Sequence, residues 1–140
     1  MELENCINFL LSTAQHNVFQ YLSGQLAEHG ITPAQYGVMN CLWRYRDLTP
    51  KQIGELLHLK ASSVSGILEQ MQKNGLLERN VDPENRRTIR VSPTQKTLDL
   101  QPAIEKIILE MNRLVMEPFT EQEQEQIRRS LTVIGSRELS

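Results

Sequence analysis

The sequence predicts a mainly α-helical fold that contains one small β-hairpin. Apolar residues recur every three or four positions through most of the 140-residue chain, as they do on one face of an amphipathic helix. Residues that cap helices stand just before several of these segments. Only the stretch after Gly75 alternates apolar and polar residues in the manner of half-buried strands. The length favours a single domain that can bury a core without disulfides or metals.

The N-terminal segment is predicted to form one long amphipathic helix over residues 3–29. Its apolar side chains keep the spacing of a single helix face: they are Leu3, Ile7, Leu10, Leu11, Ala14, Val18, Tyr21, Leu22 and Leu26. Gly30 follows this pattern and suits the left-handed position after a helix, where a Cβ would cost energy.

Three shorter helices are predicted next, over residues 33–45, 50–57 and 61–74. The first two begin with the pattern Thr-Pro-x-Gln, at Thr32 and Thr49. This pattern is typical of a capping box, in which the Thr and Gln side chains satisfy each other's free backbone N–H groups. Gly75 suits the end of the third helix.

A β-hairpin and two further helices complete the prediction. Leu77, Arg79 and Val81, and then Ile89 and Val91, alternate with polar residues on either side of the turn sequence Asp82-Pro83-Glu84-Asn85. Pro93 and Thr94 can start a second long helix, over residues 94–117, which Pro118 would end. A last helix, introduced by a third capping pattern at Thr120, carries Ile127, Leu131 and Ile134.

Charge is distributed unevenly, although the net charge is only −2. Residues 1–43 contain no Lys or Arg, residues 44–96 carry a net charge of +4, and residues 97–140 carry −3. We therefore expect the middle of the chain to face a polyanion. No apolar run exceeds three residues, which excludes a membrane span. Two cysteines and the lack of a signal-peptide pattern favour a cytoplasmic protein.

Short helices followed by a hairpin give the element order of a winged helix-turn-helix. The chain resembles the MarR family of bacterial and archaeal transcription regulators over essentially its whole length. The segments that carry the resemblance are Leu-Thr-Pro-Lys-Gln-Ile-Gly-Glu-Leu-Leu at 48–57, Ser-Ser-Val-Ser-Gly-Ile-Leu at 62–68, Asn-Gly-Leu-Leu-Glu-Arg at 74–79 and Asp-Pro-Glu-Asn-Arg-Arg at 82–87.

The resemblance implies a winged helix-turn-helix with long N- and C-terminal dimerisation helices. Residues 31–93 would form the DNA-binding part, and residues 1–30 and 94–140 the dimerisation parts, of one structural domain. We expect a homodimer that binds a pseudo-palindromic double-stranded DNA operator, acts as a repressor and is released by a small-molecule or stress signal. The family often binds small aromatic compounds, so an aromatic effector is an expected partner.

The predicted recognition helix, over residues 61–74, supplies the first group of site residues. Its polar side chains can reach base edges and phosphates, a glycine lets the backbone approach DNA closely, and a lysine can contact phosphate. The residues are Lys60, Ser62, Ser63, Ser65, Gly66 and Gln70. The alternative for the serines is helix capping and solvation, which is expected to account for one of them.

The hairpin supplies the second group, which comprises Asn85, Arg86, Arg87 and Arg90. Guanidinium groups beside a tight turn can enter a narrow minor groove. By resemblance, Arg87 is the minor-groove residue and Arg86 a phosphate contact. Asn85 stands where the family has a carboxylate, so it can hydrogen-bond but cannot form an ion pair. Arg90 is expected to brace the wing or to contact phosphate.

Two other functions stay open. A winged-helix module that binds only proteins is favoured by the acidic pI of about 5.9. A thiol-based sensor would use Cys6, because one branch of the family senses organic peroxides through a thiol in the first helix. Asn8, however, holds the matching position, and no Lys or Arg precedes residue 44 to activate a thiol. Cys41 is expected in the core. No catalytic, cofactor or metal-binding motif is present, which argues against an enzyme.

Overall fold

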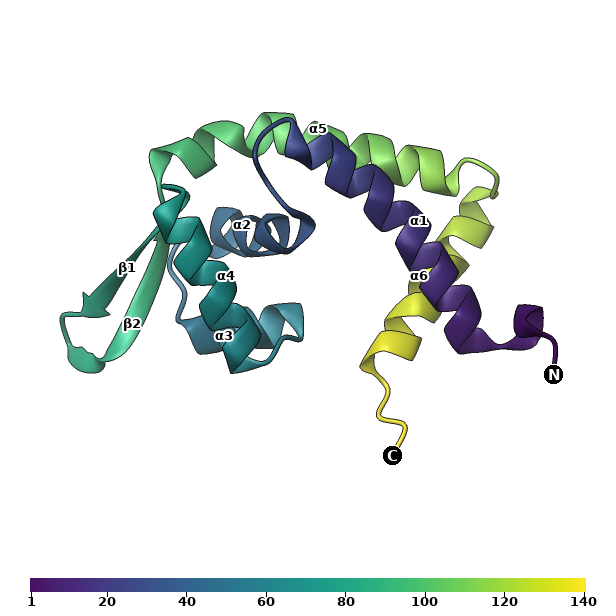
Figure 1. Ribbon diagram of the computed structural model, residues 1–140, viewed down its shortest axis with the longest axis horizontal. Coiled ribbons are helices and arrows are strands. Elements are labelled where there is room, and N and C mark those ends of the chain that lie inside the picture. The colour runs from purple at the N-terminus through teal and green to yellow at the C-terminus, as the bar shows by residue number, and fades with distance from the viewer.

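The computed structural model describes all 140 residues and confirms a mainly α-helical protein with one small β-hairpin (Figure 1). A 3-10 turn, η1 (Leu3–Asn5), precedes the other elements, which are α1 (Ile7–Ala27), α2 (Pro33–Tyr45), α3 (Pro50–Leu57), α4 (Ala61–Lys73), β1 (Leu77–Asp82), β2 (Asn85–Pro93), α5 (Gln95–Met116) and α6 (Glu121–Ser136).

The prediction of one unbroken N-terminal helix is wrong at its start. Cys6 has an extended backbone, with φ −92° and ψ 113°, and separates η1 from α1. No glycine or proline marks this break, and the apolar spacing continues across it. Such spacing reports which residues share a face, so it does not reveal a one-residue interruption of the backbone.

The predicted helix ends are confirmed. Each of three helices begins with a capping box, formed by Thr32 with Gln35, Thr49 with Gln52, and Thr120 with Glu123. Gly30 and Gly75 adopt φ values of 71° and 73°, in the left-handed region that glycine tolerates best.

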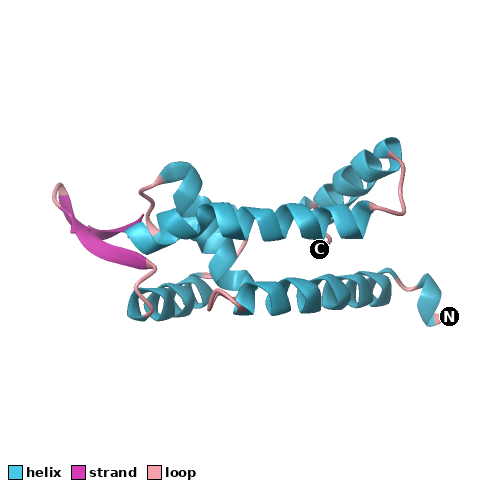
Figure 2. Cartoon of the chain, turned by 90° about the horizontal axis from the view of Figure 1, so that it is seen from above, coloured by secondary structure: helices cyan, strands magenta, loops and turns pink.

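The hydrophobic core occupies only the middle of the chain. All 19 buried residues lie between Leu26 and Ile104, in α2, α3, α4, the hairpin, the adjoining parts of α1 and α5, and the short loops at Ile31, Leu48 and Leu76. The rest of α1, the second half of α5 and all of α6 contribute no buried residue. These parts extend away from the core and gather near both chain termini (Figures 1 and 2). No helix combines the length and the apolar character needed to cross a membrane.

The hairpin is attached to the core at its base. Strands β1 and β2 pair antiparallel, with Leu77 opposite Pro93 and Val81 opposite Ile89, and the register shifts at the tip. At the base, Leu48 from the loop between α2 and α3 exchanges two backbone hydrogen bonds with Val91, at 3.0 and 2.7 Å. This bridge fixes where the wing leaves the helical core.

Candidate nucleic-acid interface

A tight turn joins α3 to α4 and sets the orientation of α4. His58 ends α3 in the left-handed conformation, with φ 57°, and the N–H of Leu59 donates to the carbonyl of Gly54 at 2.9 Å. A Cβ on Gly54 would lie 3.1 Å from the carbonyl oxygen of Leu59. The turn can therefore pack closely against α3 because residue 54 is glycine.

Helix α4 has one buried and one exposed face. Val64, Leu68 and Met71 are buried in the core. The six residues predicted to contact DNA are all exposed: they are Lys60, which caps the helix, and Ser62, Ser63, Ser65, Gly66 and Gln70 within it. The structure thus brings the whole predicted set together on one helix, directed away from the core.

None of the three serines caps α4, so of capping and solvation only solvation can account for one of them. The N-cap residue is Lys60, and its side chain makes no capping hydrogen bond. Because α4 begins at Ala61, Ser62 and Ser63 are already inside its first turn, and no hydrogen bond joins the hydroxyls of Ser62, Ser63 or Ser65 to the rest of the chain. All three hydroxyls are left available to a ligand.

Gln70 lies two turns further along α4 and is engaged locally. Its Nε2 donates to Oδ1 of Asn74 at 3.3 Å, in a contact that is exposed to solvent. An exposed bond of this length contributes little, so Gln70 can exchange it for another partner.

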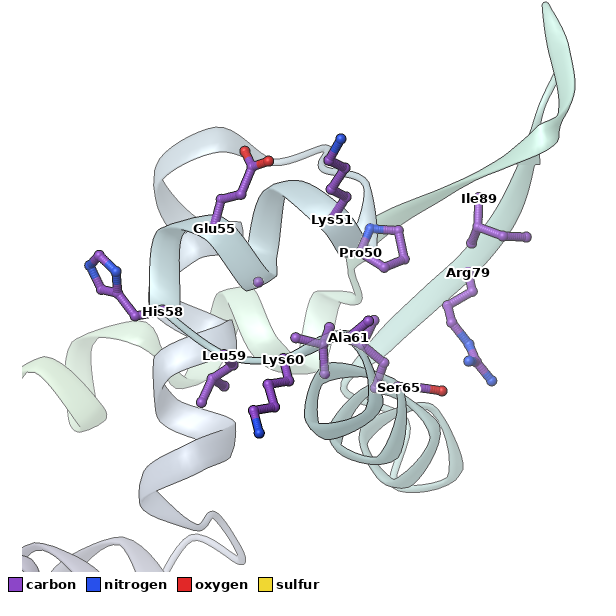
Figure 3. A pocket seen from close by; sticks show the side chains of 13 residues that line it. Pro50, Lys51, Glu55, His58, Leu59, Lys60, Ala61, Ser65, Arg79 and Ile89 are labelled. Carbon is purple, nitrogen blue, oxygen red and sulfur yellow. The ribbon is translucent and has the colours of Figure 1, made fainter. Parts of the chain in front are cut away.

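A groove of about 780 Å³ opens between α3, the first half of α4 and the hairpin (Figure 3). Lys60 and Ser65 line it from the α4 side, while Arg79 and Ile89 line it from the strands. Lys51, in the first turn of α3, lines it as well and was missed by sequence reasoning. The capping box at Thr49 could have indicated it in the sequence, because it places Lys51 in the first turn of α3.

The tip of the wing carries two cations without partners. Arg86 and Arg87 are exposed, and neither takes part in an ion pair. Asn85 Oδ1 accepts a hydrogen bond from the backbone N–H of Arg87 at 3.1 Å. Asn85 therefore shapes the turn through the backbone and leaves the guanidinium of Arg87 free.

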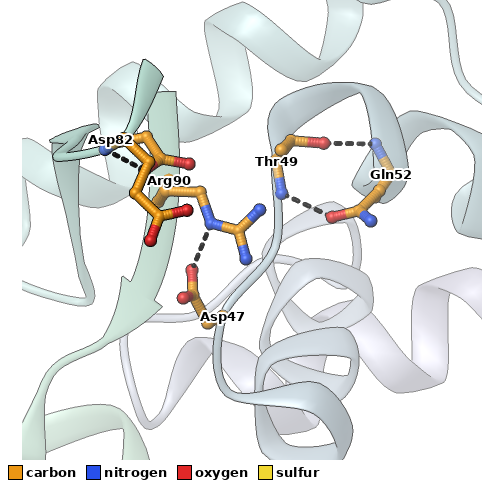
Figure 4. Close-up of polar contacts among 6 residues, drawn as sticks. Asp47, Thr49, Gln52, Asp82 and Arg90 are labelled. Carbon is orange, nitrogen blue, oxygen red and sulfur yellow. Dashed lines mark hydrogen bonds and ion pairs between the residues drawn. The ribbon is translucent and has the colours of Figure 1, made fainter. Parts of the chain in front are cut away.

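The other two hairpin arginines contact the protein itself. Arg90 Nε lies 3.1 Å from Asp47 Oδ1 (Figure 4). Arg79 Nε donates to Gln72 Oε1 at 2.6 Å. Both contacts brace the wing against the helical core.

The two cysteines occupy different environments. Cys41 is buried among core residues, as expected, and burial raises the pKa of its thiol despite the opposing charge of Arg44. Cys6 is half-buried at the N-cap of α1. No group of three or more His, Cys, Asp or Glu residues is arranged to hold a metal ion.

Comparison with known proteins gives consistent matches. The model of the MarR family matches residues 31–89. The organic hydroperoxide resistance transcriptional regulator of Bacillus subtilis is 32% identical over 95 residues, which cover 68% of this chain and 65% of that protein. A probable transcriptional regulator from Pseudomonas aeruginosa has a TM-score of 0.86 at 27% identity and covers 95% of this chain and 99% of that one. MepR from Staphylococcus aureus, in a DNA complex, has a TM-score of 0.87 at 25% identity, and the alignment covers 93% of this chain and 96% of that one.

These matches confirm the predicted winged helix-turn-helix fold. The sequence alignments span 65% and 63% of two Bacillus subtilis relatives, slightly less than two thirds of their length. The structural alignments with the Pseudomonas and Staphylococcus proteins extend over more than nine tenths of both chains. The curated relatives are named as transcriptional regulators, and none is named as an enzyme.

Proposed function

This chain belongs to the MarR family, and we propose that it is a sequence-specific DNA-binding transcriptional regulator. One observation carries the proposal: the exposed face of α4 presents the unpartnered hydroxyls of Ser62, Ser63 and Ser65 beside Lys60. Hydroxyls can bond base edges and phosphates, and a helix of this size fits the major groove of B-DNA. In this proposal the serines and Gln70 set the sequence preference, and Gly66 lets the helix approach the bases.

The wing would supply a second contact. Arg86 and Arg87 are exposed cations without ion pairs, which suits binding to the phosphates and to the negative potential of a narrow minor groove. Arg87 is the proposed minor-groove residue and Arg86 the proposed phosphate contact. Arg90 would contribute less, because its guanidinium already contacts Asp47.

The proposed active form is a homodimer held together by residues 1–30 and 94–140, with residues 31–93 contacting DNA. Three helices carry apolar side chains that are each at least 40% exposed: Ile7, Phe9, Leu10 and Phe19 on α1, Leu109, Leu114 and Val115 on α5, and Leu131, Val133 and Ile134 on α6. A second copy would bury them, and its two-fold symmetry would match a pseudo-palindrome with half-sites about 34 Å apart.

Regulation would follow from the same geometry. The protein would act in the cytoplasm as a repressor, and a small aromatic effector or a stress signal would favour a different separation of the two recognition helices. Thiol sensing is the second candidate, favoured by the likeness to a regulator named for organic hydroperoxide resistance. If Cys6 is the sensor, Cys6→Ser abolishes peroxide-induced release from DNA; release that persists in this variant rejects the candidate.

A mobility-shift titration tests DNA binding directly. The probe is the DNA upstream of the protein's own coding region, and the competitor is unrelated DNA, at several salt concentrations. We expect tight, salt-dependent binding to one fragment, and we expect the double substitution Ser62→Ala, Ser65→Ala to reduce the preference over unrelated DNA. Ser12→Ala, at an exposed serine of α1, is the matched control. Absence of binding at every salt concentration would favour the protein-interaction module instead.

A further inference from the structure

The first turn of α5 is bonded to the segment that leaves α4. Three successive carbonyls after α4 each accept a side-chain hydrogen bond from this one turn. The donors are Lys96 Nζ, Thr94 Oγ1 and Thr97 Oγ1, which bond the carbonyls of Asn74, Gly75 and Leu76 at 3.2, 2.6 and 2.5 Å. The segment that follows the recognition helix is therefore tied to the start of the long helix α5 by directional contacts.

Helix α2 joins the same turn through Trp43. The indole Nε1–H donates to the carbonyl of Thr97 at 2.9 Å in a buried contact that spans 54 positions of sequence. Thr97 has no exposed surface, and its hydroxyl and carbonyl bond two different elements. We refer to Trp43, Leu76, Thr94 and Thr97 as the α4–α5 joint.

The joint restricts orientation more tightly than apolar packing does. Apolar contacts tolerate sliding, whereas a buried hydroxyl or indole N–H has to keep a well-aligned acceptor. The Thr94 hydroxyl also bonds the segment after α4. Thr94 is the N-cap residue of α5, yet its hydroxyl donates to Gly75 and makes no capping bond, unlike the threonines before α2, α3 and α6.

We infer that the α4–α5 joint fixes the angle between the recognition helix and the dimerisation helix, and so sets the half-site spacing that the dimer accepts. This inference rests on the proposed function. Helix α5 runs from the joint to a second half in which Leu109, Leu114 and Val115 are exposed. In a dimer joined through those ends, a small rotation at each joint changes the separation of the two copies of α4. Trp43 and Thr97 are then positioning residues that determine spacing without contacting DNA.

The test measures affinity for operators whose half-sites are moved closer or further apart by one base pair. Thr97→Val removes the hydroxyl at constant shape, and Trp43→Phe removes the indole N–H. The preference is the ratio of the affinity for the optimal spacing to the affinity for the altered spacing. Each variant is expected to reduce this ratio about fivefold, the effect of losing one hydrogen bond. Thr97→Ser keeps the hydroxyl and should retain the preference. Ile53→Val, which loses one methyl from the same core, should lower stability without changing the preference.

A second measurement separates the joint from the proposed function. Spin labels on Ser62→Cys, in a Cys6→Ser background, report the distance between the two copies of α4 without DNA, since the remaining thiol of Cys41 is buried. Thr97→Val is expected to broaden the distance distribution. A spacing preference that stays at the wild-type value in Thr97→Val overturns the inference. If the wild-type protein binds no DNA, the proposed function fails. In that case the inference is judged by the distances alone, and it is overturned if the labelled protein with and without Thr97→Val gives equal distance distributions.

Discussion

Arg90 reaches from strand β2 to Asp47, with Nε 3.1 Å from Oδ1, and thereby links the wing to the loop between α2 and α3 across 43 positions of sequence. The Leu48–Val91 bridge lies beside it. These two contacts hold the base of the wing, whereas the guanidinium groups of Arg86 and Arg87 at its tip take part in no ion pair. The hairpin arginines therefore differ in their contacts, since the guanidinium of Arg90 binds Asp47 and those of Arg86 and Arg87 form no ion pair.

The first prediction contrasts Arg87 with Arg90. Arg87→Ala should weaken binding to all DNA sequences and make the negative slope of log affinity against log salt shallower by about two, for one phosphate-equivalent contact in each copy of a dimer. Arg90→Ala should change this slope much less. An exposed ion pair is worth at most about 1 kcal/mol, so the unfolding free energy should also change little. Salt titrations of both variants make the comparison, and equal slope changes would contradict the assignment.

The second prediction concerns Gly66, which lies exposed within α4. Nothing lies within 4 Å of the place that a Cβ would occupy. Gly66→Ala should raise the free energy of unfolding by about 0.5–1 kcal/mol through its higher helix propensity. If DNA approaches the backbone here, operator binding should nevertheless weaken by about 1–3 kcal/mol, as for one lost base contact.

Gly24→Ala, in α1, is the matched control for Gly66, because its Cβ would also meet nothing within 4 Å. It should stabilise the fold and leave operator affinity unchanged. Operator affinity of Gly66→Ala equal to that of the wild type would exclude close approach of DNA to this position.

The third prediction concerns the turn between α3 and α4. A Cβ at Gly54 would lie 3.1 Å from the backbone oxygen of Leu59, which cannot move without shifting α4. Gly54→Ala should therefore destabilise the protein by about 1–3 kcal/mol, as overpacking does. In Gly37→Ala the added Cβ would meet only the side-chain end of Leu57, at 3.3 Å, so its cost should be smaller. Thermal unfolding compares the two variants, and equal or reversed midpoints would refute the argument.

The fourth prediction is an alkaline loss of stability. Burial raises the pKa of the Cys41 thiol, and burial together with the charge of Glu105 raises the pKa of the Tyr36 hydroxyl. Above a pH of about 8.5 the unfolded chain releases the thiol proton before the folded chain does, so the free energy of unfolding falls as pH rises. Below that pH this contribution is fully present. Denaturant titrations at neutral and alkaline pH should show the fall, and Cys41→Ala should reduce it; an undiminished fall in this variant would exclude the thiol as a cause.

The fifth prediction tests the dimer. Val133 lies on α6, where no residue is buried, and is 54% exposed. Val133→Asp should leave the core between Leu26 and Ile104 folded and shift the protein from dimer to monomer in light scattering. Gln122→Asp introduces the same charge on the same helix and should remain dimeric. A dimer that survives Val133→Asp at low micromolar concentration would place the interface elsewhere.

Local features were predictable from the sequence alone. The capping boxes at Thr32, Thr49 and Thr120 and the left-handed glycines at 30 and 75 depend on residues within a few positions of one another. The exposed face of α4 followed for the same reason, since its helical spacing separates Val64 and Leu68 from the serines. The interruption at Cys6 was not predictable, because neither a glycine nor a proline marks it.

The sequence by itself thus determined the element order, most helix boundaries and the residues that α4 presents to solvent. Only the tertiary structure decided which polar side chains find a partner within the protein and which stay free to bind a ligand. Folding brings Asp47 to Arg90 and Trp43 to Thr97 from positions 43 and 54 residues apart, while the three serines of α4 meet no partner. Helix periodicity and capping arise between near neighbours in the chain, whereas the partner of a polar side chain depends on how distant elements pack.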